Sequence, residues 1–185
     1  MTTGRSARTR ALLQETALGL FAEQGYDETT VEQIARAAGV SHMTFFRHFA
    51  TKDAVVLDDG FDPAIAGAVA ATEASLPPLT RVCDGLRAAL DHVDVPADDV
   101  RRRVRIASQH PTLRMGMYAN TEATREAIVG VLREDGADEL AARVAAAAVL
   151  AALTVALQEW SLSDDKTPMS SRLRAALAVV DGEAL

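Results

Sequence analysis

One stretch of this chain, from Val144 to Leu157, carries no charged residue and consists mainly of alanine, leucine and valine. This composition favours an α-helix that is apolar on every side, and such a helix must be covered on every side. The stretch is shorter than the ~20 apolar residues that a helix needs to cross a bilayer. Because each alanine buries little area, several partner helices are needed. We therefore expect an all-α protein with this stretch as a central packing element.

The last predicted helix, from about Pro168 to Gly182, is the natural companion of that stretch. Pairing both with a second copy of the chain gives a four-helix dimer interface. The candidate interface residues are Val149, Leu150, Leu153, Leu157, Leu173 and Leu177. The residues leave open the alternative that the stretch is core of a single chain, and both can hold for different faces.

Composition excludes several classes of protein. The chain has 185 residues, 49% of them hydrophobic, with both charge signs present, which excludes wholesale disorder. The first residues lack the apolar core of a signal peptide. A single cysteine, Cys83, excludes an internal disulfide framework and a multi-cysteine zinc site, and a structural thiol is favoured over a redox sensor. A soluble, cytoplasmic protein that does not bind membranes is expected.

Charge and aromatic residues divide the chain into two parts. Residues 1–52 have a net charge of +1 and most of the aromatic residues, whereas residues 53–185 account for the rest of the overall charge of -7. An acidic protein can still bind nucleic acid through a locally basic face. We therefore expect two domains, with the boundary after residue 52.

The first of these parts contains signals for three helices. A first helix is expected from about Ser6 to Gln24, ended by Gly25. Thr30 begins a capping box with Gln33, which starts a second helix that ends at Gly39. Ser41 is a cap for a third helix, from about His42 to Phe46. Two short helices joined by a glycine-containing turn behind a longer helix are typical of a helix-turn-helix unit.

In such a unit the second short helix enters the major groove of DNA. His42, Met43 and Thr44 suit the edges of bases, whereas Thr30, Ser41, His48 and Lys52 suit phosphate oxygens. The alternative is a helical hairpin whose polar residues are merely solvated.

The residues from Thr30 to Ser41 and from Thr44 to Phe49 resemble the DNA-binding head of the TetR/AcrR family of bacterial transcriptional regulators, as does the segment Leu20–Tyr26. The resemblance covers roughly residues 8–57. It implies a homodimer with an all-α, ligand-sensing second domain. Carried over by position, the DNA-contacting residues are Ser41, Thr44, Arg47, His48 and Lys52. Phe46 departs from the pattern, because many members have a tyrosine there whose hydroxyl contacts a phosphate.

The second part, residues 53–185, is expected to be an effector-binding and dimerisation domain made of helices. Prolines and apolar spacing predict a helix over about 52–60 and another that begins at residue 63. Further helices are predicted over 79–93, 96–110, 111–136 and 137–162.

An effector pocket needs apolar walls with a few polar groups. The candidates are Met115, Met117, Tyr118, Asn120, Gln158 and Trp160, although ordinary core is the more favoured interpretation of each. The arginines of 101–105 suit a phosphate-bearing ligand or a solvated helix face. The pair Phe45-Phe46 and the segments 58–63 and 111–114 weakly resemble TetR-type regulators with acyl-CoA-like ligands.

No catalytic or cofactor-binding motif is present, and the four histidines are scattered, so no enzyme, cofactor or metal site is expected. The sequence therefore predicts a homodimeric DNA-binding regulator, and a repressor is favoured over an activator. A small apolar or amphipathic effector is expected to release it from a palindromic operator. The alternative is a carrier or sequestering protein for a hydrophobic metabolite with a vestigial DNA-binding head. The sequence leaves open the effector, the operator, the regulated genes and the choice between repressor and activator.

Overall fold

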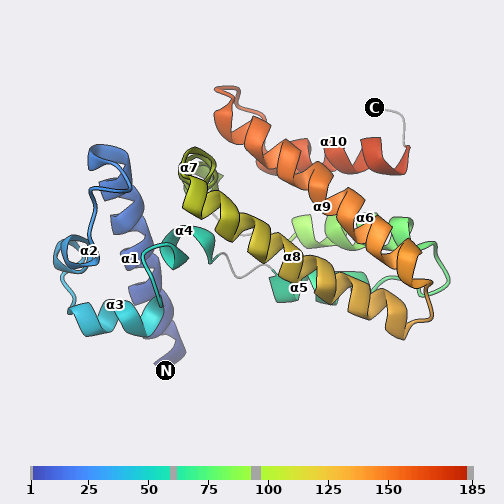
Figure 1. The fold of residues 1–185 in the computed structure, drawn as a ribbon, viewed down its shortest axis with the longest axis horizontal. Helices are drawn as coiled ribbons and strands as arrows, with labels where there is room; N and C mark the ends of the chain where they lie inside the picture. The colour runs from blue at the N-terminus through green and yellow to red at the C-terminus, as the bar shows by residue number, and fades with distance from the viewer. Residues whose placement is uncertain (1, 59–61, 93–96, 183–185) are drawn as a thin grey trace. The chain divides into compact units, whose positions relative to one another are not determined.

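The computed structural model describes residues 2–58, 62–92 and 97–182 of the chain. Over these residues all regular secondary structure is α-helical (Figure 1), so the predicted fold class is confirmed. The helices are α1 (Thr2–Gln24), α2 (Val31–Ala37), α3 (His42–His48), α4 (Ala54–Leu57), α5 (Asp62–Ala70), α6 (Pro78–Leu90), α7 (Ala97–Gln109), α8 (Pro111–Glu134), α9 (Glu139–Leu162) and α10 (Met169–Asp181).

The predicted helix boundaries differ from the observed ones mainly around the helix-turn-helix unit. Helix α1 begins at Thr2 rather than near Ser6, and α3 continues to His48. The helix expected over 52–60 is a single turn, α4, because Asp58 already has an extended backbone. The predicted helix end at Gly60 and the boundaries near Val93 and Pro96 lie outside the described residues.

The chain divides into two compact units, and the division differs from the predicted boundary after residue 52. The head unit comprises Met1–Asp58 and Asp98–Gly116, and the body unit comprises Asp59–Ala97 and Met117–Leu185. Helix α8 therefore contributes its first residues to the head unit and the rest to the body unit. Helix α7, which the sequence assigned to the second domain, belongs to the head unit except for its first residue.

The head unit has its own apolar core. Helix α1 contributes the fully buried Leu13 and Leu18, and α2 contributes Ile34. Phe45 of α3 and Phe49 just after it are 0% and 1% exposed. Each fully buried side chain of this size contributes roughly 1.5–3 kcal/mol to folding. This core fixes α3 against α1 and leaves the opposite face of α3 in solvent.

In the body unit α9 packs against α6 and α10, and α5 packs against α6. The two helices α5 and α6 approach closely at Gly85, where an added Cβ would lie 2.7 Å from the Cα of Val69. Arg81 is 1% exposed, and it donates hydrogen bonds to Thr72 Oγ1 (3.0 Å) and Asp135 Oδ2 (2.7 Å). A buried arginine needs such partners, because an unpaired buried charge is strongly unfavourable.

Candidate nucleic-acid interface

Two side-chain caps build the helix-turn-helix unit. Thr30 Oγ1 accepts a hydrogen bond from the backbone N–H of Gln33 (3.2 Å), and the Gln33 side chain accepts one from the backbone N–H of Thr30 (2.7 Å). Ser41 Oγ accepts from the backbone N–H of Thr44 (3.1 Å) at the start of α3. Gly39 adopts φ 67° in the turn between the two helices, a conformation that glycine reaches without strain. The predicted caps of α2 and α3 are therefore confirmed.

The outer face of α3 carries the predicted base-reading residues. Met43 is 75% exposed, and Thr44 is half-buried with its hydroxyl 2.9 Å from Ser41 Oγ. His42 is held from two sides: its Nε2 lies 3.2 Å from Glu32 Oε1, and its ring stands edge-on to Phe46 at 4.7 Å. The site residues on α3 are therefore presented to solvent in a fixed arrangement.

Glu32 and Phe46 position His42, and the sequence assigned neither of them this role. The pKa of Glu32 is lowered, chiefly by a hydrogen bond from its own backbone N–H and also by His42. Phe46 packs against His42 and Phe45. The spacing of α2 and α3 residues in the sequence gives no signal for a contact between the two helices at these positions.

Lys52 is bound within the head unit. Its ammonium group donates to the carbonyl oxygens of Tyr26 (2.8 Å) and Thr29 (3.1 Å) and lies 4.1 Å from the centre of the Tyr26 ring. The Tyr26 hydroxyl in turn donates to Asp53 Oδ1 at 2.5 Å, and burial together with this carboxylate raises the pKa of Tyr26. The hydrogen-bonding capacity of Lys52 that was predicted for phosphate is thus largely used inside the protein.

His48 also faces partly inward. Its Nε2 is buried without a hydrogen-bond partner among the described residues, and its backbone oxygen accepts from Arg10 Nη1 (2.8 Å). Burial first, and then the charges of Arg47 and Arg10, lower the pKa of His48. These surroundings favour the neutral form of the imidazole. Arg47, at the end of α3, is exposed and makes no ion pair with any described residue.

The corner between α7 and α8 contacts the same part of the head unit. The His110 ring lies 5.0 Å from the Tyr26 ring, and His110 Nδ1 lies 3.6 Å from Asp27 Oδ2. On the first turns of α8, a Cβ at Gly116 would overlap the side chain of Leu57. No local signal in the sequence indicated that residues so far along the chain complete the head unit.

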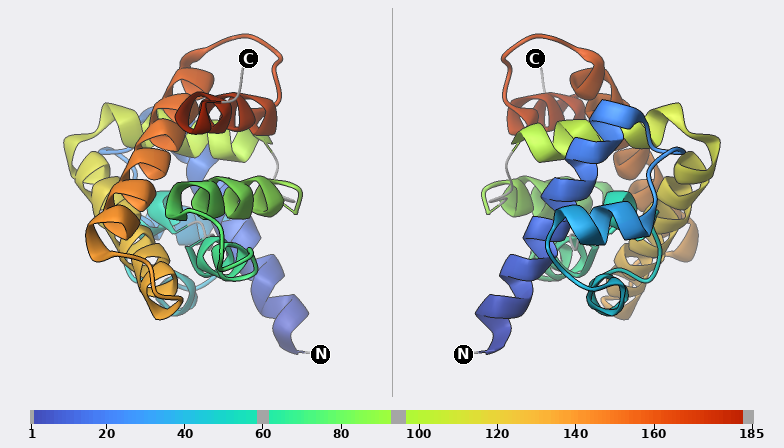
Figure 2. Two further views of the ribbon diagram at one scale, coloured as in Figure 1. Left: turned by 90° about the vertical axis from the view of Figure 1, so that its right-hand side faces the viewer. Right: turned by 90° about the vertical axis from the view of Figure 1, so that its left-hand side faces the viewer.

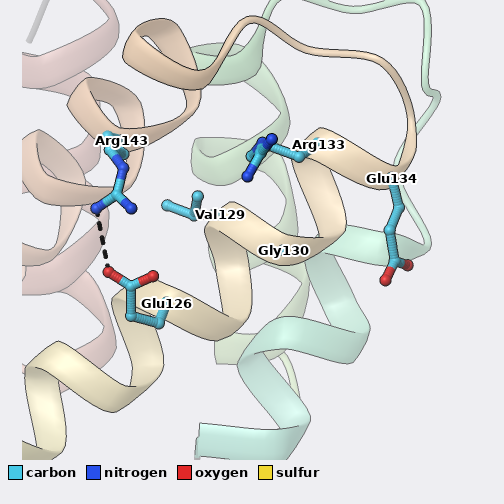
Figure 3. A pocket seen from close by; sticks show the side chains of 6 residues that line it. All are labelled: Glu126, Val129, Gly130, Arg133, Glu134 and Arg143. Carbon is cyan, nitrogen blue, oxygen red and sulfur yellow. Dashed lines mark hydrogen bonds and ion pairs between the residues drawn. The ribbon is translucent and has the colours of Figure 1, made fainter.

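The candidate effector residues do not line a pocket that the described residues of the body unit form. That pocket, of about 390 Å³, is open to solvent and lined by Glu126, Val129, Gly130, Arg133, Glu134 and Arg143 (Figure 3). Arg143 and Glu126 point toward each other across it, 3.3 Å apart. This is a polar hollow without the apolar walls that were expected for the effector.

Individual effector candidates have different environments. Trp160 is 1% exposed and its indole N–H donates to the Thr167 carbonyl oxygen (2.9 Å), which makes it part of the core beneath the α9–α10 loop. Met115 and Tyr118 are 68% and 65% exposed, and Met117 and Gln158 are half-buried. Their role in ligand binding stays a prediction.

Five of the six candidate dimer residues are buried within the single chain. Val149, Leu150 and Leu153 of α9 and Leu173 and Leu177 of α10 are at most 9% exposed, and Leu157 is half-buried. In the single chain these side chains pack between α6, α9 and α10, and their role in a dimer interface stays a prediction. An all-apolar helix has no periodicity that distinguishes its buried face from its exposed one.

The opposite face of α9 is apolar and exposed. We call it, with two residues of α10, the exposed stripe: Leu140, Val144, Ala147, Ala151, Val155, Leu162, Ala175 and Val179. The 24-residue helix also has the length of a membrane span, and an 18-residue window within it has a mean hydropathy of 2.2. The uncharged stretch from Val144 to Leu157 is shorter than the helix that contains it. Length and composition alone do not distinguish a membrane span from a helix that packs against protein.

Among the described residues, no three His, Cys, Asp or Glu side chains gather in a way that could hold a metal ion. Cys83 is buried in α6.

Two family models match the chain. The one described as bacterial regulatory proteins of the tetR family matches residues 13–58, and the one described as the MftR C-terminal domain matches residues 76–183. The HTH-type transcriptional regulator TcmR of Streptomyces glaucescens is 35% identical over 87% of this chain and 65% of its own length. The chain thus spans slightly less than two thirds of TcmR. MftR of Mycobacterium tuberculosis, named for mycofactocin biosynthesis regulation, is 30% identical over 95% of this chain and 91% of its own.

Solved structures share the fold. NalD, a repressor of a multidrug efflux pump in Pseudomonas aeruginosa, matches with a TM-score of 0.61 and 22% identity over 97% of both chains. FadR of Thermus thermophilus, solved in complex with lauroyl-CoA, matches with a TM-score of 0.54 and 22% identity over 95% of both chains.

Proposed function

Because this chain belongs to the TetR family of bacterial transcriptional regulators, whose members are not enzymes, we propose that it is a cytoplasmic, homodimeric repressor. It binds a palindromic operator and leaves it when a small apolar or amphipathic effector binds to the body unit. The observation that carries this proposal is the capped helix α3, whose outer face carries the exposed His42 and Met43 beside the half-buried Thr44.

Each α3 reads one half-site in the major groove, and the half-sites are about 34–36 Å apart along the duplex. Met43 contacts the thymine methyl group or another apolar edge, and Thr44 and His42 supply hydrogen bonds to polar base edges. Arg47, Ser41 and Thr30 contact phosphates around the groove. His48 and Lys52 support this surface from inside the head unit, since their polar groups are buried or bound there.

Dimerisation through the exposed stripe brings the two heads onto one duplex. An apolar stripe of this extent on a soluble chain favours a protein partner, and a second copy supplies the same stripe in an isologous four-helix interface. This proposal replaces the buried residues that the sequence suggested with their exposed neighbours on α9 and α10.

The continuous helix α8 is the proposed route from effector to DNA. Its first turn belongs to the head unit, where His110 next to it contacts Tyr26, and its remainder belongs to the body unit. An effector that shifts the body part of α8 changes the position of Tyr26 and Lys52 and thereby of α3. A coupling of about 1–3 kcal/mol is sufficient to change operator affinity 5- to 150-fold.

The effector class is proposed from two similarities. The shared fold with FadR of Thermus thermophilus bound to lauroyl-CoA and with FadR of Bacillus subtilis bound to stearoyl-CoA favours an amphipathic, acyl-CoA-like molecule. Met117, Tyr118 and Gln158 stay candidates for its contacts.

The test is selection of bound duplexes from a random DNA pool by the purified full chain at ~0.15 M salt. Recovery of a two-fold symmetric motif is the expected result. Binding that depends on salt but not on sequence, by a folded dimer, would contradict the proposal and favour the carrier function. Thr44→Ala then changes the selected motif at one position of each half-site, with a loss of about 1–3 kcal/mol for the parent motif.

A further inference from the structure

The first turns of α1 carry two arginines that precede the segment of the helix-turn-helix motif. Arg5 and Arg8 are exposed, and neither makes an ion pair or a side-chain hydrogen bond with a described residue. No acidic residue precedes Glu15 in the sequence. These two cations are therefore available to a partner outside the chain.

Several helical arginines of this protein pair with a carboxylate one helical turn away. The pairs Arg87–Asp84, Arg102–Asp99, Arg125–Glu122 and Arg143–Glu139 are all of this kind. In contrast, the residue three positions after Arg5 is Arg8, so the two like charges face each other on one side of the helix. Cations near a helix N-terminus are also unfavourable because of the helix dipole. Local helix stability therefore does not explain this arrangement, whereas an anionic partner does.

The structure fixes where these arginines lie. Arg10 donates to the backbone oxygen of His48 (2.8 Å), pairs with Asp58 (2.9 Å) and lies over the Phe49 ring (4.2 Å). These contacts fasten α1 beside the end of α3. Because α1 already begins at Thr2, its first turns continue as rigid helix past α3 within the head unit (Figure 1), and both views of Figure 2 show this projecting end.

The helical repeat also determines which way the two arginines face. Arg8 precedes Arg10 by two residues, or about 200° around the helix axis, so Arg5 and Arg8 face away from the contacts that Arg10 makes. The start of α1 lies at the same extremity of the head unit as α3 (Figure 1). Long side chains on the free side of this helix end are therefore within reach of a partner that α3 contacts.

We propose that Arg5 and Arg8 form a second DNA contact, to the phosphodiester backbone next to the groove that α3 enters. This inference rests on the proposed DNA-binding function and adds a region that the helix-turn-helix motif does not include. Guanidinium groups bind phosphate with paired hydrogen bonds. The contact supplies affinity but no sequence preference.

The experiment compares four full-length proteins on two duplexes of equal length, the palindrome recovered from the random pool and a scrambled version. The proteins are the parent, Arg5→Ala with Arg8→Ala, Arg5→Lys with Arg8→Lys, and a control with Arg133→Ala and Lys166→Ala. The control removes the same charge from exposed positions of the body unit. Dissociation constants are measured between 50 and 300 mM salt. Alanine is at least as good a helix former as arginine, so thermal unfolding of the alanine variant is expected to match the parent.

The expected result is a roughly tenfold weaker binding of the alanine variant to both duplexes near 0.15 M salt. The slope of log affinity against log salt concentration falls by about 2, one unit for each lost phosphate contact. The lysine variant retains most of the affinity, and the control behaves like the parent.

Three results overturn the inference: an alanine variant with the parent's slope, a control that loses as much affinity, or a loss limited to one of the two sequences. A parent protein that prefers neither duplex contradicts the proposed function instead. In that case the salt slopes on the scrambled duplex still decide whether Arg5 and Arg8 contact phosphates.

Discussion

The ammonium group of Lys52 connects three parts of the head unit, because it binds two carbonyl oxygens and the face of Tyr26. We predict that Lys52→Met, which keeps the aliphatic stem, lowers the free energy of unfolding by about 2 kcal/mol through the loss of charge-assisted hydrogen bonds. The salt slope of DNA binding is expected to stay within half a unit of the parent. Urea unfolding and a salt titration test this, and a slope reduced by a full unit would show that Lys52 contacts phosphate directly.

Asp165 is the residue whose protonation most affects the α9–α10 loop. The Arg172 guanidinium (2.5 Å) and the backbone N–H of Thr167 (2.9 Å) hold the pKa of this carboxyl well below its usual value. A lowered folded-state pKa gives stability that is present above the unfolded value of about 4 and is lost as the pH falls through the folded value.

We therefore predict that Asp165→Asn is less stable than the parent at pH 7 and that the difference shrinks between pH 4 and pH 2. Urea unfolding at several pH values measures it, with Asp164→Asn as the neighbouring control. A difference that is constant with pH would show that the side-chain charge is not responsible.

At the scale of the helix, Ser41 has two roles that one substitution does not separate. Its hydroxyl caps α3, and it is also a proposed phosphate contact. Ser41→Ala is expected to cost about 1 kcal/mol of stability, whereas glycine at an N-cap costs only a few tenths.

We predict that Ser41→Gly retains nearly the parent's stability but binds operator DNA as weakly as Ser41→Ala does. Thermal unfolding and DNA titrations of both variants give the two quantities. Operator binding by Ser41→Gly at the parent's affinity would assign the hydroxyl to capping alone.

Two other helices, α5 and α6, depend on one close approach. At Gly85 an added Cβ would lie 2.7 Å and 2.8 Å from backbone atoms of Val69, so the helices must separate to accommodate it. We predict that Gly85→Ala destabilises the protein by about 1–3 kcal/mol. Gly130→Ala is the matched control, because no atom lies within 4 Å of a Cβ at that position. It is expected to raise the free energy of unfolding by about 0.5–1 kcal/mol. Equal effects at the two positions would contradict this packing.

For the whole molecule, we propose that the exposed stripe decides the oligomeric state. We predict that Val144→Glu with Val155→Glu weakens dimerisation roughly a hundredfold or more, because each carboxylate would be buried without a partner. The monomer is expected to stay folded, since these side chains are 57% and 59% exposed in the single chain. Sedimentation velocity and circular dichroism measure the two properties.

The control for that experiment is Leu153→Ala, which removes a buried side chain and is expected to lower stability by about 2–5 kcal/mol. Any effect of Leu153→Ala on dimerisation is expected to be smaller than its effect on stability. A Val144→Glu and Val155→Glu protein that still sediments as a dimer would locate the interface elsewhere.

The sequence by itself determined the helices and the family, because these depend on neighbouring residues. Caps at Thr30 and Ser41, the turn at Gly39 and apolar spacing are signals that act within a few positions of the chain, and the structure contains each of them. The candidate base-reading residues follow from the same motif, since the third helix of such a unit has a known place.

Only the tertiary structure decided which side of each helix is free. The alanine-rich α9 is apolar all round, so no periodicity in it distinguished Leu153, which packs inside the chain, from Val155, which is exposed. The Lys52 side chain points into the head unit because it binds residues that are distant in sequence. Helix α7 likewise belongs to the head unit although it lies far from the first helices along the chain. Such contacts form when whole helices pack, and the local pattern of either partner does not encode them.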